Sequence, residues 1–305
     1  MLTVAGYEDV SCLLCQSQKR HLKYEKVHMG RPIFVQQCDD CGFLYFSPRP
    51  TRAMFQEIYA HEYFKNFIPD FSQEFHFQAK YLAEGFRLKK ISELCPRGAD
   101  SLVEIGCGFG YQLLAAQDHF KNVIGVELNH EAAQHTRSLG FTVLETPAED
   151  CDIPTGSVDV VVMYTVIEHL LDPMKVLQKI HSWLKPNGLL VVQTCNANSL
   201  NLKWQGVNSN MICIDHVSFF SDRTLKQALR QSGFHLEDMM YNRGLSAAEE
   251  RQYCEIQQVA PLKKTNPAAA RKLSCKLDWL CRLRALNFLG VTWNISITAF
   301  CRKGM

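Results

Sequence analysis

The sequence predicts an α/β fold in which a doubly wound, seven-stranded and mostly parallel sheet follows a small metal-binding module. Three observations predict it. From residue 101 onward, apolar runs typical of strands alternate with helical patterns, and such alternation requires a mostly parallel sheet covered on both faces. A glycine-rich turn follows the first of these strands, as in nucleotide-binding folds. Two Cys-x2-Cys pairs near the N-terminus have the spacing of a zinc site.

The N-terminal region carries four cysteines in two pairs, Cys12, Cys15, Cys38 and Cys41. A strand-like segment, residues 32–37, leads into the second pair. Four thiolates can surround one zinc ion tetrahedrally, and they leave no coordination position open for chemistry. Gly42 lets backbone N–H groups turn toward the sulfur atoms. We therefore predict a structural zinc ribbon over residues 1–50.

Residues 51–97 predict a helical linker that also serves as a lid over the substrate. Helical patterns lie at 51–61 and 72–94, and in the second the apolar residues recur at helical spacing. The Pro and Gly that follow Cys95 end this helix.

The α/β domain is predicted over residues 98–305, with an insertion at 242–290. Its strands are expected at 101–106, 122–127, 141–145, 158–163, 188–194, 234–241 and 293–302. Its helices are expected at 110–118, 130–139, 172–184 and 222–232. The alternation of the first five strands with helices predicts parallel pairing, and the last two strands fit an antiparallel pair.

The insertion contains a basic amphipathic stretch. Between residues 261 and 285 there are seven Lys or Arg residues and one acid, Asp278. We favour a lid or packing helix with a solvated outer face. The alternative is weak contact with a membrane surface through 261–285.

Composition narrows the functional classes. The net charge of +2 is too small to indicate a nucleic-acid partner, and a hydrophobic content of 47% supports a full core. No apolar run is long enough for a transmembrane helix, and residues 1–9 lack the pattern of a secretion signal. The 13 cysteines are odd in number and most stand singly, which favours reduced thiols. We expect a cytoplasmic protein, and the sequence does not define its oligomeric state.

The glycine-rich turn reads Glu104-Ile-Gly-Cys-Gly-Phe-Gly110. Glycine has no Cβ, so a ligand can lie against the backbone. Glu127 ends the second strand, where an open sheet places a carboxylate over a ribose. The spacing is GxGxG, because Tyr111 stands where a dinucleotide-binding turn has its third glycine. This spacing favours a compact nucleoside without a pyrophosphate.

Five segments together resemble the class I S-adenosylmethionine-dependent methyltransferases. They are 104–110, Glu127, 147–150, 159–169 and 184–188. They follow the order and spacing of that family over about residues 80–240. The N-terminal ribbon is similar to one found in small bacterial methyltransferases of sugar, polysaccharide and natural-product pathways. The resemblance implies a Rossmann-like methyltransferase fold and S-adenosyl-L-methionine as cofactor.

The resemblance also implies which residues contact the methionine and ribose of this cofactor. Gly106, Gly108 and Gly110 would let the methionine half approach the backbone. Glu104 would orient its ammonium group. Glu127 would accept hydrogen bonds from both ribose hydroxyls, as a carboxylate with two oxygens can.

The remaining cofactor contacts implied by the resemblance concern the adenine and the sulfonium. Ala148 and Glu149 would flank the adenine, and Asp150 could serve in place of Glu149. Tyr164 would lie beside the sulfonium, which aromatic faces and carbonyl oxygens stabilise.

A general base is needed only where the methyl acceptor must lose a proton, because alignment does much of the work in an in-line methyl transfer. The candidates are His169 and His216. Asp215-His216 resembles the acid–histidine pair of zinc-ribbon sugar methyltransferases, whose histidine is the assigned base. Each histidine can instead be a hydrogen-bonded loop anchor. Thr165 stands where ubiquinone-type O-methyltransferases place a metal-binding acid, which argues against a metal-assisted reaction.

We therefore expect a methyltransferase that O- or C-methylates a small molecule, such as a sugar or a natural-product intermediate. One alternative is a zinc-ribbon scaffold protein whose methyltransferase fold is not catalytic. Another is a methyltransferase that acts on RNA or protein. The intact glycine turn and Glu127 argue against a scaffold.

Overall fold

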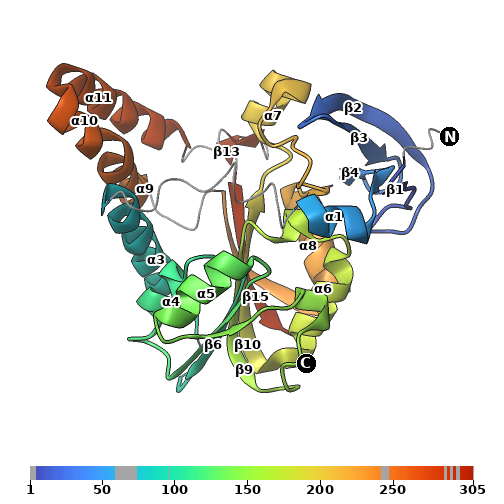
Figure 1. The fold of residues 1–305 in the computed structure, drawn as a ribbon, viewed down its shortest axis with the longest axis horizontal. Coiled ribbons are helices and arrows are strands. Elements are labelled where there is room, and N and C mark those ends of the chain that lie inside the picture. Colours follow the sequence, from blue (N-terminus) through green and yellow to red (C-terminus); the bar gives the residue numbers. More distant parts are fainter. Residues whose placement is uncertain are drawn as a thin grey trace.

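The fold is seen in a computed structural model of the 305-residue chain (Figure 1). The structure describes residues 5–58, 74–95, 97–241, 247–284, 287–288, 291–292 and 296–304. No helix among them is long and apolar enough to cross a membrane.

The centre of the molecule is a seven-stranded sheet with the order β12-β15-β10-β9-β6-β7-β8. Its strands are β6 (Ser101–Ile105), β7 (Asn122–Val126), β8 (Thr142–Leu144), β9 (Val158–Tyr164), β10 (Leu184–Cys195), β12 (Phe234–Met240) and β15 (Ser296–Lys303). The pairs from β10 through β9, β6 and β7 to β8 are parallel, and β15 runs antiparallel to both β10 and β12. The predicted doubly wound sheet and its antiparallel end are confirmed.

The strand boundaries follow the apolar runs closely, with one difference at β10. All but the last residue of β9 are buried, as expected for a strand that is covered on both faces. β10 begins at Leu184 and not at 188 as predicted. Its pairing with β9 is irregular between Leu184 and Leu189, so the Pro-Asn-Gly turn is carried as a bulge within the strand.

Helices cover both faces of the sheet (Figure 1). On one face lie α3 (Glu74–Leu94), α4 (Tyr111–Ala116) and α5 (His130–Ser138), and on the other α6 (Pro173–Trp183) and α8 (Asp222–Gln231). α6 begins at a proline, and the side chain of Asp172 accepts the N–H of Lys175 at 3.0 Å. Ser221 and Thr224 form a capping box at the start of α8. The predicted helices are confirmed within the described residues.

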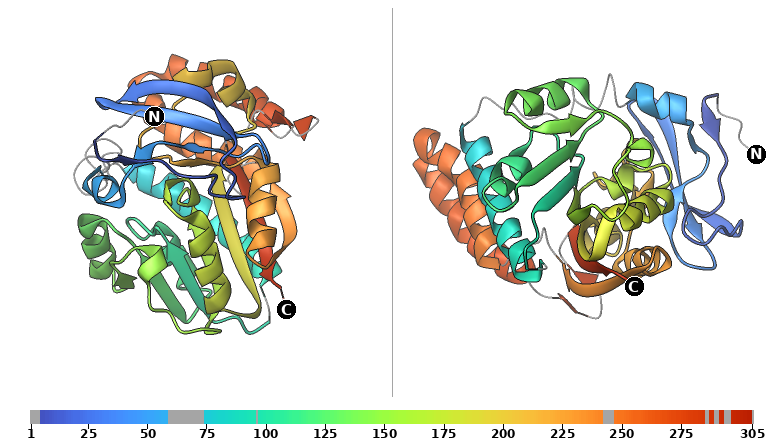
Figure 2. Two further views of the ribbon diagram at one scale, coloured as in Figure 1. Left: turned by 90° about the vertical axis from the view of Figure 1, so that its right-hand side faces the viewer. Right: turned by 90° about the horizontal axis from the view of Figure 1, so that it is seen from below.

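The insertion forms a helical unit beside α3 (Figures 1 and 2). It contains α9 (Ala247–Cys254), the π-helix η5 (Glu255–Val259), α10 (Ala260–Thr265) and α11 (Pro267–Arg284). Its apolar contact with α3 is a cluster that includes Ala83, Cys254, Val259, Ala270 and Leu277. The packing-helix interpretation is thereby supported.

Two short strands and four short helical segments complete the described parts of the domain. The hairpin β13 (Asn287–Phe288) and β14 (Val291–Thr292) follows the insertion. The helices are η2 (Ala148–Asp150), η3 (Ile167–His169) and α7 (Leu200–Gln205), the last followed by the turn η4 (Gly206–Asn208). The predicted start of the last strand, residues 293–295, lies outside the described residues.

The N-terminal ribbon shares a sheet with the α/β domain. β2 (Arg20–His28), β3 (Arg31–Cys38) and β4 (Leu44–Phe46) form an antiparallel sheet whose fourth strand is β11 (Ser218–Phe219). A small pair, β1 (Tyr7–Glu8) with β5 (Arg49–Pro50), flanks it. The pairing of β11 with β4 is not predicted from the sequence. It attaches the ribbon to the segment that follows Asp215 and His216.

The linker begins with a short helix, α1 (Arg52–Ile58). The predicted helix at 51–61 is confirmed over these seven residues, and residues 59–61 lie outside the described part. Phe55 and Ile58 are buried in a cluster with apolar residues of the ribbon and of residues 211–219.

Candidate active site

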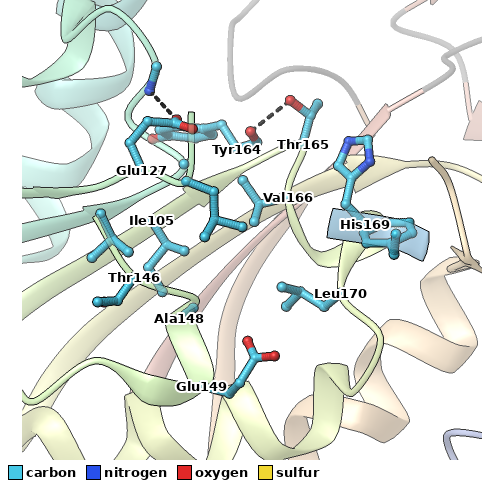
Figure 3. Close-up of a pocket in the computed structure, with 15 residues that line it drawn as sticks. Ile105, Glu127, Thr146, Ala148, Glu149, Tyr164, Thr165, Val166, His169 and Leu170 are labelled. Carbon is cyan, nitrogen blue, oxygen red and sulfur yellow. Dashed lines mark hydrogen bonds between the residues drawn. The ribbon is translucent and has the colours of Figure 1, made fainter. Parts of the chain in front are cut away.

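A pocket lies at the carboxyl ends of β6, β7, β8 and β9, where open parallel sheets bind ligands (Figure 3). Seven of the residues singled out in the sequence line it, Gly106, Gly108, Glu127, Ala148, Glu149, Tyr164 and His169. Glu104 and Gly110 are not among the lining residues. The glycine turn, the end of β7 and η2 therefore meet around one cavity.

The glycine turn has the backbone conformation that glycine favours. Gly106, Gly108 and Gly110 all have positive φ, at 72°, 50° and 78°. A Cβ on Gly110 would lie 2.9 Å from Cγ2 of Thr136, whose hydroxyl donates to the carbonyl of Gly108 at 2.8 Å. Gly110 therefore allows α5 to pack against the turn. Of the three glycines, Gly106 and Gly108 are the two that line the cavity.

We expect Gly106→Ala to lower the free energy of unfolding by about 2–4 kcal/mol. The new Cβ would overlap Cγ2 of Val166, a β-branched side chain that lines the pocket, and the residue would also keep a positive φ. Gly108→Ala is the matched control, since nothing lies within 4 Å of its added Cβ. It should cost only the backbone strain, about 1 kcal/mol. Urea denaturation measures both, and equal losses would contradict the predicted clash.

Glu127 connects the end of β7 with the glycine turn. Its side chain is 8% exposed. Oε2 accepts the N–H of Gly108 at 2.9 Å, and Oε1 accepts the N–H of Asn129 at 2.8 Å (Figure 3 draws the first). Burial raises the pKa of Glu127, and these backbone donors oppose that rise. Glu127 lines the pocket, and each of its two oxygens is oriented by a backbone donor.

Glu104 lies on β6 behind the pocket wall. It is buried, and its Oε2 has no hydrogen-bond partner among the described residues. Burial and the neighbouring Glu84 raise the pKa of Glu104 well above its usual range. A buried carboxyl oxygen without a partner is costly, and a bound ammonium would satisfy it. This observation fits the methionine end of the implied cofactor.

Arg87 of α3 lies at the same end of the site, and the sequence analysis did not single it out. Its guanidinium donates to both carboxylate oxygens of Glu84 at 2.7 and 2.9 Å, and to Oε1 of Gln193 at 2.9 Å. It also lies 4.2 Å from the ring centroid of Tyr164. The Glu84-x2-Arg87 spacing was visible in the sequence, but it did not show that this face of α3 is buried against the sheet.

Tyr164 carries the aromatic face beside this cluster. Burial raises the pKa of Tyr164. Its hydroxyl is buried and has no hydrogen-bond partner in the described part of the chain. Tyr164 lines the pocket and already has the Arg87 guanidinium against its ring, and an aromatic face of this kind suits a positively charged group.

The opposite end of the pocket is formed by η2 and closed by α1. Ala148 and Glu149 lie on η2, and both line the cavity. Arg52 of α1 donates to Oε1 of Glu149 and lies 3.6 Å from Oδ2 of Asp150. Phe55 of α1 also lines the pocket. The start of the linker thus contacts the end of the site expected to hold the adenine, and its role as a lid stays a prediction.

His169, Asp215 and His216 come together beside the pocket. Nδ1 of His169 donates to the backbone carbonyl of Asp215 at 2.9 Å and lies 3.4 Å from its Oδ2. The rings of His169 and His216 are 4.7 Å apart and edge-on. His216 itself donates through Nδ1 to the carbonyl of Met211 at 2.9 Å. Nδ1 of His169 thus meets both the carbonyl and the carboxylate of Asp215, and the same carboxylate lies within 4.8 Å of a ring nitrogen of His216, its predicted partner.

The electrostatics of this cluster favour a neutral imidazole beside a carboxylate. Burial lowers the pKa of His169. Burial raises the pKa of Asp215, but His169 and His216, together with hydrogen bonds from Cys213 and the backbone, hold the pKa below its usual range. Because Nδ1 of His169 carries the proton that it donates, Nε2 carries the lone pair, and this ring can accept a proton.

The N-terminal ribbon lies on the opposite side of the molecule from the insertion (Figure 2), and its four cysteines converge. Their sulfur atoms all lie within 4.8 Å of one another. The pairs Cys12–Cys41 and Cys15–Cys38 are each 3.5 Å apart. Gly42 has a positive φ and donates to the carbonyl of Cys38. Four convergent sulfur donors suit a structural zinc ion.

Comparisons with known proteins agree with this geometry. Residues 71–238 match the model of the methyltransferase domain family. Over 106 residues the chain is 36% identical to a probable S-adenosylmethionine-dependent methyltransferase of Mycobacterium tuberculosis, covering 34% of this chain and 39% of that protein. Over 103 residues it is 33% identical to a ubiquinone biosynthesis O-methyltransferase of Cereibacter sphaeroides, covering 32% and 42%.

These matches span about half or less of the length of those curated relatives. Among solved structures, a geranyl diphosphate methyltransferase in complex with S-adenosylmethionine has a similar fold. The TM-score is 0.50 and the identity 16%, and the match covers 72% of this chain and 85% of that one.

Proposed function

The chain belongs to the methyltransferase domain family, and from this premise we propose that it transfers the methyl group of S-adenosylmethionine to a small-molecule acceptor. The observation that carries the proposal is the pairing of two carboxylates around the glycine turn. Glu127 lines the pocket with both oxygens oriented by backbone donors, and Glu104 has a buried oxygen without a partner in the described residues.

Different residues of the pocket contact different parts of the cofactor in this proposal. When bound, S-adenosylmethionine supplies an electrophilic methyl group on a sulfonium. Glu127 accepts from the ribose hydroxyls, and Glu104 accepts from the ammonium group. Ala148 and Glu149 flank the adenine, and Arg52 holds the carboxylate of Glu149 in place. Tyr164 gives its aromatic face to the positive charge.

The acceptor approaches from the side of the pocket that His169 lines. The catalytic group in this proposal is the trio His169, Asp215 and His216. His169 accepts a proton at Nε2 when the acceptor is a hydroxyl or an enolisable carbon. Asp215 then stabilises the imidazolium through the contacts at Nδ1, and His216 packs edge-on against the ring.

We expect His169→Ala to lower kcat roughly a hundredfold with little change in the binding of S-adenosylhomocysteine. His216→Ala should lower kcat less, because His216 affects the reaction only through its contact with the ring of His169. Activity in the unaltered chain should fall as the pH is lowered through the pKa of His169, since protonation removes the base. Initial rates with an unmethylated acceptor, measured against pH, test the effects on kcat, and calorimetry tests the binding of S-adenosylhomocysteine. Full activity of His169→Ala would return this histidine to a structural role.

Transfer of radiolabelled methyl groups tests the proposed function itself. The chain would be incubated with S-[methyl-³H]adenosylmethionine and separate pools of nucleotide-linked sugars, phenolic compounds, total RNA and denatured protein. We expect the label in a small-molecule pool and in neither macromolecule. Label in RNA or protein would overturn the assigned acceptor class. A failure of wild-type protein to bind the cofactor at all would overturn the activity.

The four cysteines are proposed to hold one structural zinc ion. With four protein ligands it would leave no position for a substrate, so its contribution is to the fold of the ribbon. The insertion is proposed to act as a packing element on α3, with membrane contact through 261–285 as the alternative.

A further inference from the structure

The ribbon reaches the acceptor side of the site through one histidine. His28 ends β2, at a two-residue hairpin turn formed by Met29 and Gly30, both of which have positive φ. Its Nδ1 accepts the backbone N–H of Ile214 at 3.3 Å, across 186 residues of sequence. Ile214 directly precedes Asp215 and His216 in the chain.

We propose that His28 is a positioning residue for the acceptor side, one that holds the backbone at Ile214 and so sets where Asp215 meets His169. The inference rests on the proposed function for its catalytic meaning. His28 was not singled out in the sequence, because nothing local connects the tip of a ribbon hairpin with a loop so far along the chain.

The segment that His28 holds, residues 211–219, contacts the ribbon at several other points. Phe46 of β4 donates its N–H to the carbonyl of Val217 at 3.0 Å, and β11 continues the ribbon sheet from there. An apolar cluster joins ribbon residues with this segment, among them Ile33, Val35, Met211, Ile212 and Val217. The side chain of Ile214 is itself part of this cluster, and the hydrogen bond that its N–H donates to His28 fixes the direction of the backbone at the same residue.

The positioning acts two peptide units further along the chain, at the carbonyl of Asp215. The carbonyl of Asp215 accepts Nδ1–H of His169, and its carboxylate lies 3.4 Å from the same nitrogen. A backbone fixed at the N–H of Ile214 therefore fixes the carbonyl that orients His169. Such indirect orientation of a functional histidine through its Nδ1–H is a recognised way to set the reactive nitrogen.

The surroundings of His28 suit an acceptor. Burial, together with Lys26 and His216, lowers its pKa, against an opposing effect of Asp215. The ring is therefore neutral at neutral pH, with its proton on Nε2 and its lone pair on Nδ1, facing Ile214.

Three variants test this role without any methyl acceptor. His28→Leu keeps a side chain of similar bulk and removes the hydrogen-bond acceptor. His28→Asn restores an acceptor, Oδ1, close to the position of Nδ1. His21→Leu makes the same change on the same strand, where the exposed His21 contacts Asp39 at 2.6 Å, away from the site.

Hydrogen exchange and NMR of the full chain give the readouts. We expect His28→Leu to speed exchange of the Ile214 amide about five- to tenfold, the loss of one hydrogen bond, and to broaden the Nδ1–H signal of His169. His28→Asn should restore both to near wild type, and His21→Leu should change neither. Rescue by Asn would show that the effect of His28→Leu comes from the lost hydrogen bond and not from altered packing.

The proposal is overturned if His28→Leu leaves the exchange of Ile214 unchanged. It is also overturned if His28→Asn behaves like His28→Leu. Calorimetry with S-adenosylhomocysteine keeps this result separate from the proposed function. All three variants should bind it as wild type does, whereas a wild-type chain that fails to bind would count against the function and leave the exchange result standing.

Discussion

Replacing Glu127 by alanine should weaken the binding of S-adenosylhomocysteine about a thousandfold. A hydrogen bond to a charged group contributes about 1.5–3 kcal/mol, and this carboxylate would make two to the ribose hydroxyls. The variant also loses the acceptor that holds the N–H of Gly108, so the glycine turn is less well fixed before the ligand arrives. Isothermal titration calorimetry measures the change directly.

Two further variants give this experiment its controls. Glu145→Ala removes a carboxylate just beyond the next strand, where it pairs with His130 and Arg137 outside the pocket lining. We expect its affinity to match wild type. Glu127→Gln retains one oxygen acceptor and should lose less affinity than the alanine variant. If Glu127→Ala bound S-adenosylhomocysteine as tightly as wild type, the assignment of the ribose site would be wrong.

The second large effect is expected from the ribbon. Cys38→Ser should reduce the zinc content from about one ion per chain to none, because a structural site depends on all four thiolates. Without the ion the ribbon has little core of its own. Ile33, Val35 and Phe46 would then no longer cover residues 211–219, and the temperature of thermal unfolding should fall.

Elemental analysis and hydrogen exchange over the first fifty residues measure this outcome. Cys95→Ser is the matched control, since Cys95 is a half-buried free cysteine at the end of α3, outside the four-cysteine cluster. It should keep its zinc and its ribbon. A metal-free wild-type chain whose ribbon stays fully protected from exchange would contradict the zinc assignment.

The parts of the fold that could be predicted are those in which neighbours along the chain decide the structure. A buried central strand such as β9 shows itself as a run of valines, and α6 begins where Asp172 and Pro173 supply a cap and a first turn. The glycine turn and Glu127 were found for the same reason. Both belong to one strand–helix–strand unit. Their separation along the sequence therefore predicts that they lie close together in space.

The parts that could not be predicted depend on pairing across long separations. β11 has only two residues, too few for any periodicity, yet it completes the sheet of the ribbon. Nothing in the sequence around His28 or Arg87 indicates which residues their side chains contact. Glu104 and Gly110 were placed with the ligand-contacting residues, but neither is among the residues that line the pocket, since Gly110 packs against Thr136 of α5. The contact of Glu104 with the cofactor stays a prediction, which rests on its buried oxygen without a partner in the described residues.

A crystal structure with S-adenosylhomocysteine bound tests the central claim most directly. The ribose hydroxyls should lie within hydrogen-bond distance of the Glu127 carboxylate, and the ammonium group should face Glu104. The sulfur should point toward the side of the pocket that His169 lines. A ligand bound elsewhere, or bound here with its ribose turned away from Glu127, would contradict the account.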